Sequence, residues 1–288
     1  MRSTLLVAFL TLFAVTLTAQ MGGGTPGTGP TNMMSNEILA PAAGRGPGSA
    51  GSFWRTDLWL KSAAGSTVTM EFHPNDSPTD AAAATVQVTM TSPVMYLEDV
   101  LKNKFGMDQG FGNIVLRGTQ PVSATIRAYT SSGTGSYGSG FMAMPTSMAM
   151  HGSGGTMMGN DQYQLYATGL LPEPRARVNA MVTNSGSVAI SGTLEILDAD
   201  GQPALGGTTS LPFSLRAYSS HQFVDVLSGI TSRYGDGSGL QLRLRLADGS
   251  TGMVMMLVSV ADNVTNDTYT VMGNMMNGGS SSNGGMMP

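Results

Sequence analysis

The residues best suited to binding chemistry gather in one short methionine-rich segment. The chain has 23 methionines among 288 residues, and this segment places four thioethers and one imidazole within ten positions. Soft sulfur ligands together with imidazole suit Cu(I) and Ag(I). The sequence therefore predicts a Cu(I) or Ag(I) site formed by Met142, Met144, Met148, Met150 and His151.

The methionine-rich segment is similar to the methionine-rich loops of exported copper-handling proteins. Three other interpretations stay open: adhesive apolar contacts, a sacrificial target for oxidation, and drift in composition. Packing in a core does not explain methionines in Gly/Ser-rich tails. The methionines outside the strand-like repeats or at their edges are Met21, Met33, Met34, Met142, Met144, Met148, Met150, Met157, Met158, Met272, Met275, Met276, Met286 and Met287.

The two tryptophans, Trp54 and Trp59, lie five positions apart in a segment that alternates like a strand. Side chains of a strand point alternately to opposite faces, so the two rings face opposite ways. We expect Trp54 in the core and Trp59 at the surface, as a contact residue for a sugar or a protein. Trp59 is therefore a candidate ligand contact, and a carbohydrate-binding module is one candidate function.

The sequence offers little for catalysis. It has three histidines, and the Gly-x-Ser-x-Gly elbow of many hydrolases is missing. His221 with Asp225 and a serine could form a nucleophilic site, but Asp225 matches Asp99 in a segment without histidine, so we expect both aspartates to cap a short helix. Glu71 and Glu195 occupy matching outward positions on two strands, as solvated side chains would. We predict that the protein is not an enzyme.

Acidic turns give a further candidate for metal binding. Asp198-Ala199-Asp200-Gly201 begins like a calcium-binding EF-hand loop, but no Glu closes it at the twelfth position. A hairpin turn explains the same residues. The prediction is therefore no required cofactor, with a structural calcium site as the weaker alternative.

The elements that position these residues come from a long internal repeat. Arg55, Glu71 and Asp99 recur as Arg177, Glu195 and Asp225, at separations that grow from 122 to 124 to 126 residues. Small insertions in loops explain the growth. The repeat predicts two similar domains in tandem.

Each repeat reads as a series of short strands. Residues 67–72 and 85–90 alternate strictly between apolar and polar, which is typical of half-buried strands. Leu97–Phe105 instead has helical spacing and ends at Gly106, and Phe223–Ile230 is its counterpart. Short connections favour antiparallel pairing. We therefore predict an all-β fold of two antiparallel β-sandwiches, each with one short helix.

Two motifs resemble known families. Val182–Ser187 before a strand and Leu197–Gly201 after it resemble immunoglobulin-like accessory modules of bacterial exported proteins. Phe53–Leu60 with the Asp-Val-Leu segment is similar to uncharacterised secreted bacterial proteins with tandem β-domains. The resemblance covers about residues 37–272 and implies tandem immunoglobulin-like sandwiches without a known active site. The sequence of the turn differs between the two repeats: the first has Lys61–Ala64 where the second has Thr183–Gly186.

The composition and the N-terminal segment limit where the protein can be located and what it can bind. The net charge is −4 and only 11% of residues are charged, so the clustered cations that nucleic acids need are missing. There is no cysteine. Met1-Arg2 precedes an apolar run from Leu5 to Leu17, about thirteen residues where a bilayer span needs about 20. This pattern predicts a cleaved signal peptide, no later transmembrane segment, and a secreted protein, extracellular or periplasmic.

The leading functional hypothesis is a structural or interaction module at a cell surface or in a matrix, with other extracellular proteins or a polysaccharide as partner. Copper binding and carbohydrate binding are the alternatives. The predicted organisation is a signal peptide (1–20), a flexible linker (21–35), a first domain (36–144), a Met/Gly-rich linker (145–160), a second domain (161–272) and a disordered tail (273–288).

Overall fold

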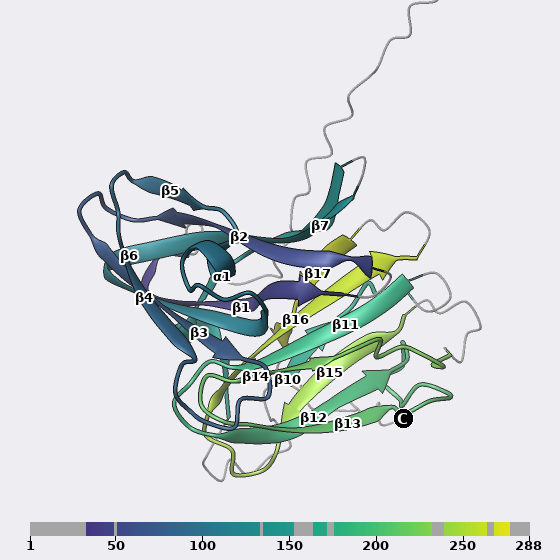
Figure 1. The fold of residues 1–288 in the computed structure, drawn as a ribbon. Coiled ribbons are helices and arrows are strands. Elements are labelled where there is room, and N and C mark those ends of the chain that lie inside the picture. Colours follow the sequence, from purple (N-terminus) through teal and green to yellow (C-terminus); the bar gives the residue numbers. More distant parts are fainter. Residues whose placement is uncertain are drawn as a thin grey trace, which may run out of the picture. The chain divides into compact units, whose positions relative to one another are not determined.

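The structure is a computed structural model of the chain (Figure 1). It confirms an all-β protein, because the described elements are strands apart from one four-residue α-helix and short 3-10 turns. Every strand pairing among them is antiparallel. The predicted signal peptide and most of the linker before residue 35 lie outside those residues. In the same described part, no helix is long and apolar enough to cross a membrane. The structure describes residues 33–48, 51–132, 135–152, 164–171, 176–231, 239–263 and 268–276.

The strands of the first half form one hydrogen-bonded sheet of eight. The order is β4-β3-β6-β1-β2-β5, with β7 also paired to β6 and β8 to β1. The strands are β1 (Ser35–Pro47), β2 (Phe53–Lys61), β3 (Thr67–Pro74), β4 (Ala84–Thr89), β5 (Val94–Leu97), β6 (Gly110–Ser132), β7 (Gly135–Met142) and β8 (Met144–Pro145).

The long strand β6 joins the two layers of this half. It pairs with β3 as far as Gly118 and with β2 from Ser123 onward. A Cβ at Gly118 would lie 2.3 Å from the carbonyl oxygen of Gln120, so glycine permits the irregular backbone at the crossing. Two apolar stretches of sequence, separated by Gly118 and Pro121, thus become one strand that serves both layers.

The second half has two five-stranded sheets. Their orders are β13-β12-β15-β10-β18 and β14-β11-β16-β17, with β9 paired to β16. The first half has the same two orders, β4-β3-β6-β1-β8 and β5-β2-β6-β7, with β6 in both. The strands are β9 (Met150–His151), β10 (Gln164–Ala167), β11 (Ala176–Asn184), β12 (Ile190–Leu197), β13 (Ser210–Leu215), β14 (Ser220–Phe223), β15 (Gln241–Leu246), β16 (Met253–Asp262), β17 (Thr268–Met272) and β18 (Asn274–Met276).

Each half has its own apolar core, and both cores follow the period-two pattern of the strands. On β3, Val68, Met70 and Phe72 are fully buried, as the alternation predicts. In the second half, residues from both sheets meet in one cluster, for example Val178 on β11 and Leu194 on β12. Burial between two sheets is what a β-sandwich requires.

The helix prediction is right for the first half and wrong for the second. Helix α1 (Val100–Asn103) forms, and the Gly106 N–H closes its C-terminal end on the carbonyl of Lys102. In the second half, Phe223 ends β14, and the residues from there to Ile230 form hydrogen-bonded turns and no helix. The glycine of this segment, Gly229, has a positive φ of 70° and comes four residues after the aspartate rather than seven, so the stop signal arrives before a helical turn is complete.

A third apolar cluster joins the two halves and is rich in methionine. Leu39 on β1 and Val115 on β6 meet Met255 on β16. Met181 and Leu257 of the second half belong to the core of the first. The unbranched thioether side chain fills irregular gaps between packed sheets. Met144, one of the methionines that the sequence alone left unexplained, packs against the same cluster, so this junction accounts for part of that methionine content.

Polar contacts cross the same junction. The side-chain amide of Asn113 donates to the carbonyl of Tyr218 at 2.7 Å and to the Ser220 hydroxyl at 2.8 Å. The Asp76 N–H donates to the Ser220 carbonyl at 2.7 Å. His221 Nδ1 lies 2.6 Å from the Asp76 carboxylate. These contacts tie β6 and the loop after β3 in the first half to β14 and the turn before it in the second.

Two predicted boundaries fall where the structure has ordered elements. The segment predicted as a linker from residue 145 begins with the end of β8, a 3-10 turn (Thr146–Met148) and β9. The segment predicted as a disordered tail from residue 273 begins with β18, which pairs with β10. Pairing with strands distant in sequence provides this order, and a local scan for Gly-rich composition does not detect it.

The buried His73 gives the junction a predicted dependence on pH. Its side chain is 3% exposed, and its ring centroid lies 5.4 Å from that of Tyr218. Burial lowers the pKa of His73 below 6.5, and the nearby Glu71 only partly opposes this effect, while Arg117 adds to it. The folded protein therefore keeps His73 neutral where the unfolded chain takes up a proton. The free energy of unfolding should fall as the pH drops below 6.5.

Urea unfolding between pH 7 and pH 5 would measure this loss. We expect His73→Gln to flatten the slope of stability against pH in that range. The exposed His151 is the matched control, and His151→Gln should leave the slope unchanged. An unaltered slope in His73→Gln would contradict the assignment.

Candidate binding face

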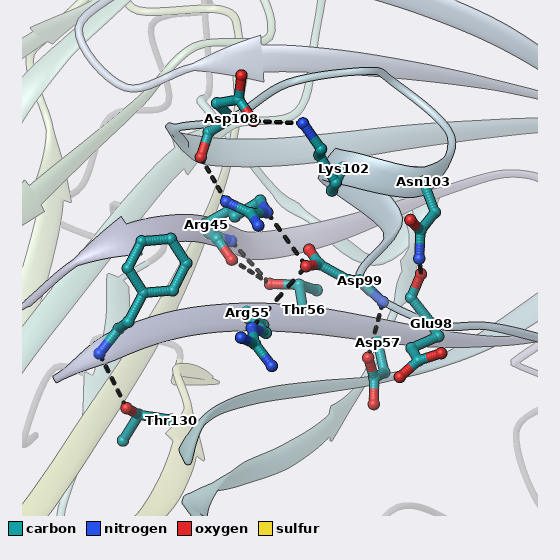
Figure 2. Close-up of polar contacts among 12 residues, drawn as sticks. Arg45, Arg55, Thr56, Asp57, Glu98, Asp99, Lys102, Asn103, Asp108 and Thr130 are labelled. Atoms are coloured by element: carbon teal, nitrogen blue, oxygen red, sulfur yellow. Dashed lines mark hydrogen bonds and ion pairs between the residues drawn. The ribbon is translucent and has the colours of Figure 1, made fainter.

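A polar lock fixes the loop before α1 to strand β2 (Figure 2). The carboxylate of Asp57 is 2% exposed and accepts the N–H of Asp99 at 2.9 Å. Asp99 adopts a positive φ of 39° and turns its own carboxylate to Arg45 at 3.1 Å, with Arg55 at 3.9 Å. Asp99 thus occupies the N-cap position of α1, but its side chain makes no capping hydrogen bond, which corrects the predicted role.

The second half contains a counterpart of this lock. The side-chain oxygen of Asn179 accepts the N–H of Asp225 at 2.9 Å, and Asp225 also has a positive φ, 49°. Asn179 lies two positions after Arg177, just as Asp57 lies two positions after Arg55. Since both halves use the same contact to fix the same turn, the repeated Arg-x-Asp/Asn strand and the Asp-Val-Leu turn serve the fold.

The outer side of the β5-β2-β6-β7 layer carries a row of aromatic and cationic side chains. Strand register sets this grouping: Arg55 is opposite Tyr129, and Trp59 is opposite Tyr96. Residues directly opposite in antiparallel strands share a face, and Arg127 lies two positions before Tyr129 on β6. We call Arg55, Trp59, Tyr96, Arg127 and Tyr129 the aromatic face.

Contacts within the aromatic face hold its rings in place. The ring centroids of Trp59 and Tyr96 are 4.9 Å apart with planes tilted by 32°. The guanidinium of Arg127 lies 4.5 Å from the ring centroid of Tyr129, a cation–π contact. Half of the Tyr96 side chain is exposed, while Trp59, Arg127 and Tyr129 are half-buried. The face therefore offers fixed, partly exposed rings.

Two glycines on the adjacent strand β7 leave this face open. Gly138 is opposite Tyr129, and Gly140 is opposite Arg127. A Cβ at Gly138 would lie 2.1 Å from the carbonyl oxygen of Ala128 and 2.7 Å from the Tyr129 Cβ, so any larger residue there would collide with β6. Glycine within a strand commonly marks a place where another molecule or backbone comes close.

The Tyr96 hydroxyl links the face to the polar lock. It donates to the second oxygen of Asp57 at 2.9 Å. Desolvation of the hydroxyl, and then this hydrogen bond to a carboxylate, raise the pKa of Tyr96 to about 12. Burial, followed by the negative charge of Asp57, also raises the pKa of Tyr129. Both phenols therefore stay neutral over the physiological range.

The equivalent surface of the second half is covered. Met181, which corresponds to Trp59, is 9% exposed, and Leu257 and Met255 on β16 are 4% and 3% exposed. These side chains pack against apolar residues of the first half. The second half uses this surface for the junction, whereas the first half carries aromatic and cationic residues there.

The five predicted copper ligands lie in different surroundings. Met142 at the end of β7 is 46% exposed, whereas Met150 is 1% exposed and belongs to the second core. Met144 packs at the junction. Met148 is half-buried and His151 is exposed. Copper binding by this set stays a prediction, and other methionines of the low-complexity segments lie outside the described residues.

The candidate catalytic groups have structural partners. Glu71 forms an ion pair with Arg117, and Glu195 lies 2.6 Å from Arg243. His221 contacts Asp76. Trp54, expected in the core, is half-buried and belongs to none of the core clusters of the described residues.

The turn proposed as a calcium site, Asp198–Gly201, is held by hydrogen bonds of its own. The Asp198 carboxylate accepts the N–H groups of Asp200 and Gln202, each at 3.1 Å, which is how an aspartate stabilises a turn. Within the described ranges, no group of three or more His, Asp or Glu residues is placed to hold a metal ion. The calcium prediction remains untested.

One cleft of about 460 Å³ lies beside the junction, lined in part by Asp76, Ser77 and Arg216. The Asp76 and Arg216 side chains are 62% and 57% exposed. Water solvates these charges well, so the cleft is a weaker candidate than the aromatic face.

Sequence reasoning identified Trp59 but missed the rest of the face. Arg127 and Tyr129 alternate with the buried Ile126 on β6, so their outward orientation was readable from period two. Their position next to Trp59 was not, because it depends on register between strands about 70 residues apart.

Comparisons with known proteins do not place the chain in a family. No protein-family model matches it, and no curated protein matches it. Protein 1070 of Thermotoga maritima is similar over 42% of this chain and 100% of its own, with 14% identity and a TM-score of 0.31. A protein of Parabacteroides distasonis, provisionally described as secreted, covers 78% of this chain and 89% of its own, at 9% identity and a TM-score of 0.20.

A Streptomyces avermitilis α-L-rhamnosidase, solved with L-rhamnose, covers 87% of this chain and 29% of its own, at 10% identity and a TM-score of 0.22. At such TM-scores none of these likenesses supports an argument about fold or function.

Proposed function

We propose that this protein is an exported, non-catalytic binding protein built from a duplicated, immunoglobulin-like β-sandwich, and that its aromatic face binds polysaccharide. The observation that carries the proposal is the pairing of Trp59 with Tyr96 beside Arg127 and Tyr129 on one open side of a sheet. The proposal joins the predicted interaction module to the predicted carbohydrate contact at Trp59.

The chemistry of the face suits a sugar chain. A pyranose ring has apolar C–H faces and a rim of hydroxyl groups, so it needs a flat apolar surface with polar groups beside it. Trp and Tyr supply rigid, amphipathic contact area at a low cost in conformational entropy. The neighbouring guanidinium groups of Arg55 and Arg127 can donate hydrogen bonds to ring substituents.

The contrast between the halves supports a role in binding another molecule. If the two sandwiches arose by duplication, the outer surface of β5-β2-β6-β7 corresponds to one that the second half buries. The identical strand orders and the two equivalent locks support that origin. The second half has Met181 and Leu257 at these positions, where they pack against the first half. The first half has Trp59 and Thr125 at the matching positions, and no packing between the two halves explains an aromatic side chain there.

Replacing Trp59 tests the proposal. The protein would be applied to immobilised polysaccharides, both charged and neutral, in affinity electrophoresis or column retention. We expect Trp59→Ala to weaken binding at least tenfold, because loss of a central aromatic contact commonly costs about 1–2 kcal/mol or more. Its circular dichroism spectrum should match that of the wild type.

Trp54→Phe is the matched control, because Trp54 lies on the same strand but points to the other side. It should retain full binding. A wild-type protein that binds none of the polysaccharides, or a Trp59→Ala variant that binds as well as the wild type, would refute the proposed function.

A further inference from the structure

Arg127 is a cation that its neutral neighbours hold in place. Its guanidinium stacks over Tyr129 and donates to the Ser136 hydroxyl at 2.5 Å. Among the described residues, no carboxylate forms an ion pair with it. Asp57 is its direct cross-strand neighbour, but both oxygens of Asp57 are engaged by Tyr96 and Asp99.

Charges of both signs surround Arg127, and Arg55 lies 3.9 Å from the Asp99 carboxylate in the polar lock. Arg55, with 43% of its side chain exposed, and Lys61, which is exposed, lie on the same side of β2. Asp57 is 2% exposed, and its negative charge acts on the face, where burial and then this charge raise the pKa of Tyr96 and Tyr129. Glu98, in the turn after β5, is the exposed carboxylate closest in sequence to the face.

An arginine that is held rigid before binding loses little entropy when it forms a bond. Its planar guanidinium matches a carboxylate through two parallel N–H donors. On the aromatic face, such a pair would form beside the rings that would stack on sugars. A ligand that carries a carboxylate on each sugar unit would therefore satisfy both features at once.

We infer that the ligand of the aromatic face is an anionic polysaccharide rich in uronic acids, with Arg127 as the residue that selects the carboxylate. This inference rests on the proposed function, since it names the class of polysaccharide. Trp59 and Tyr96 provide affinity for sugar rings of any charge, and Arg127 provides the preference for a charged chain.

The probes are alginate and polygalacturonate, each compared with its carboxyl-reduced form. Reduction turns the carboxylate into a hydroxymethyl group and keeps the rest of the sugar chain, so the two forms differ only at that one group. We expect the wild type to bind the charged forms at least tenfold more tightly, with affinity that falls as salt is added. Arg127→Gln should weaken binding of the charged forms at least tenfold and binding of the reduced forms much less, because the glutamine amide can still donate a hydrogen bond to a hydroxyl group.

Two controls separate recognition from general attraction. Arg216→Gln removes an exposed arginine of the second half and should change nothing. Trp59→Ala should weaken binding of charged and reduced chains alike. If Arg216→Gln lowers binding as much as Arg127→Gln, or if Trp59→Ala has no effect on the charged chains, binding is mere ion exchange and the inference is overturned.

The remaining outcomes separate a failure of the inference about charge from a failure of the proposed function. Equal binding of charged and reduced chains overturns the inference about charge and leaves the proposed function standing. Binding to neutral polysaccharides alone does the same. Absence of binding to every polysaccharide overturns both.

Discussion

Replacing Asp57 by alanine should destabilise the protein by about 3 kcal/mol, because the change removes two hydrogen bonds to a buried carboxylate. The Asp99 N–H and the Tyr96 hydroxyl would lose their acceptor. Asp99 also has a positive φ, a conformation that its neighbours must hold in place. Urea unfolding monitored by tryptophan fluorescence would measure the loss in free energy.

The matched variant is Asp57→Asn, because the second half uses Asn179 for the same contact. The amide oxygen can still accept the Asp99 N–H, while the amide nitrogen can donate to the phenol oxygen of Tyr96. We expect a loss of about 1 kcal/mol. Equal losses in the alanine and asparagine variants would show that the hydrogen bond to the turn contributes nothing.

The polar lock also shows how far the sequence could be taken. The repeat of Arg55, Glu71 and Asp99 in the second half is visible in the sequence, and it correctly indicated a structural role. The nature of that role was missed, because it depends on the side chain of Asp57 reaching a turn 42 residues later. A spacing that recurs in both halves indicates a shared structural role for these residues. It does not show which side-chain atom bonds to which backbone group.

Strand alternation was the most reliable guide. It predicted the buried side of β3 correctly, since period two is a local property of the chain. Features set by contact between distant strands were not predictable. The formation of strand β18 beside β10 and the burial of Met150 both come from such contacts. The aromatic face belongs to this class, because register between β2 and β6 brings Trp59 and Arg127 to one side.

Replacing Asn113 by leucine should cost about 2–3 kcal/mol, because leucine has a similar size but leaves buried acceptors without a donor. Asn113 is fully buried and its amide donates to the carbonyl of Tyr218 and to the hydroxyl of Ser220. Tyr218 has a positive φ of 54°, which is unusual for a bulky residue. The lost hydrogen bond would release a strained turn at the junction of the two halves.

Asn103→Ala is the control for this prediction. Asn103 is exposed and donates a hydrogen bond of the same kind and length, 2.8 Å, to the carbonyl of Glu98. Water can replace that donor, so its removal should cost less than about 0.5 kcal/mol. Limited proteolysis would locate the effect of Asn113→Leu, because the loop with Asp76 and the turn with Tyr218 should become cleavable together. If Asn113→Leu is as stable as Asn103→Ala, the junction is held by its methionine packing and not by this amide.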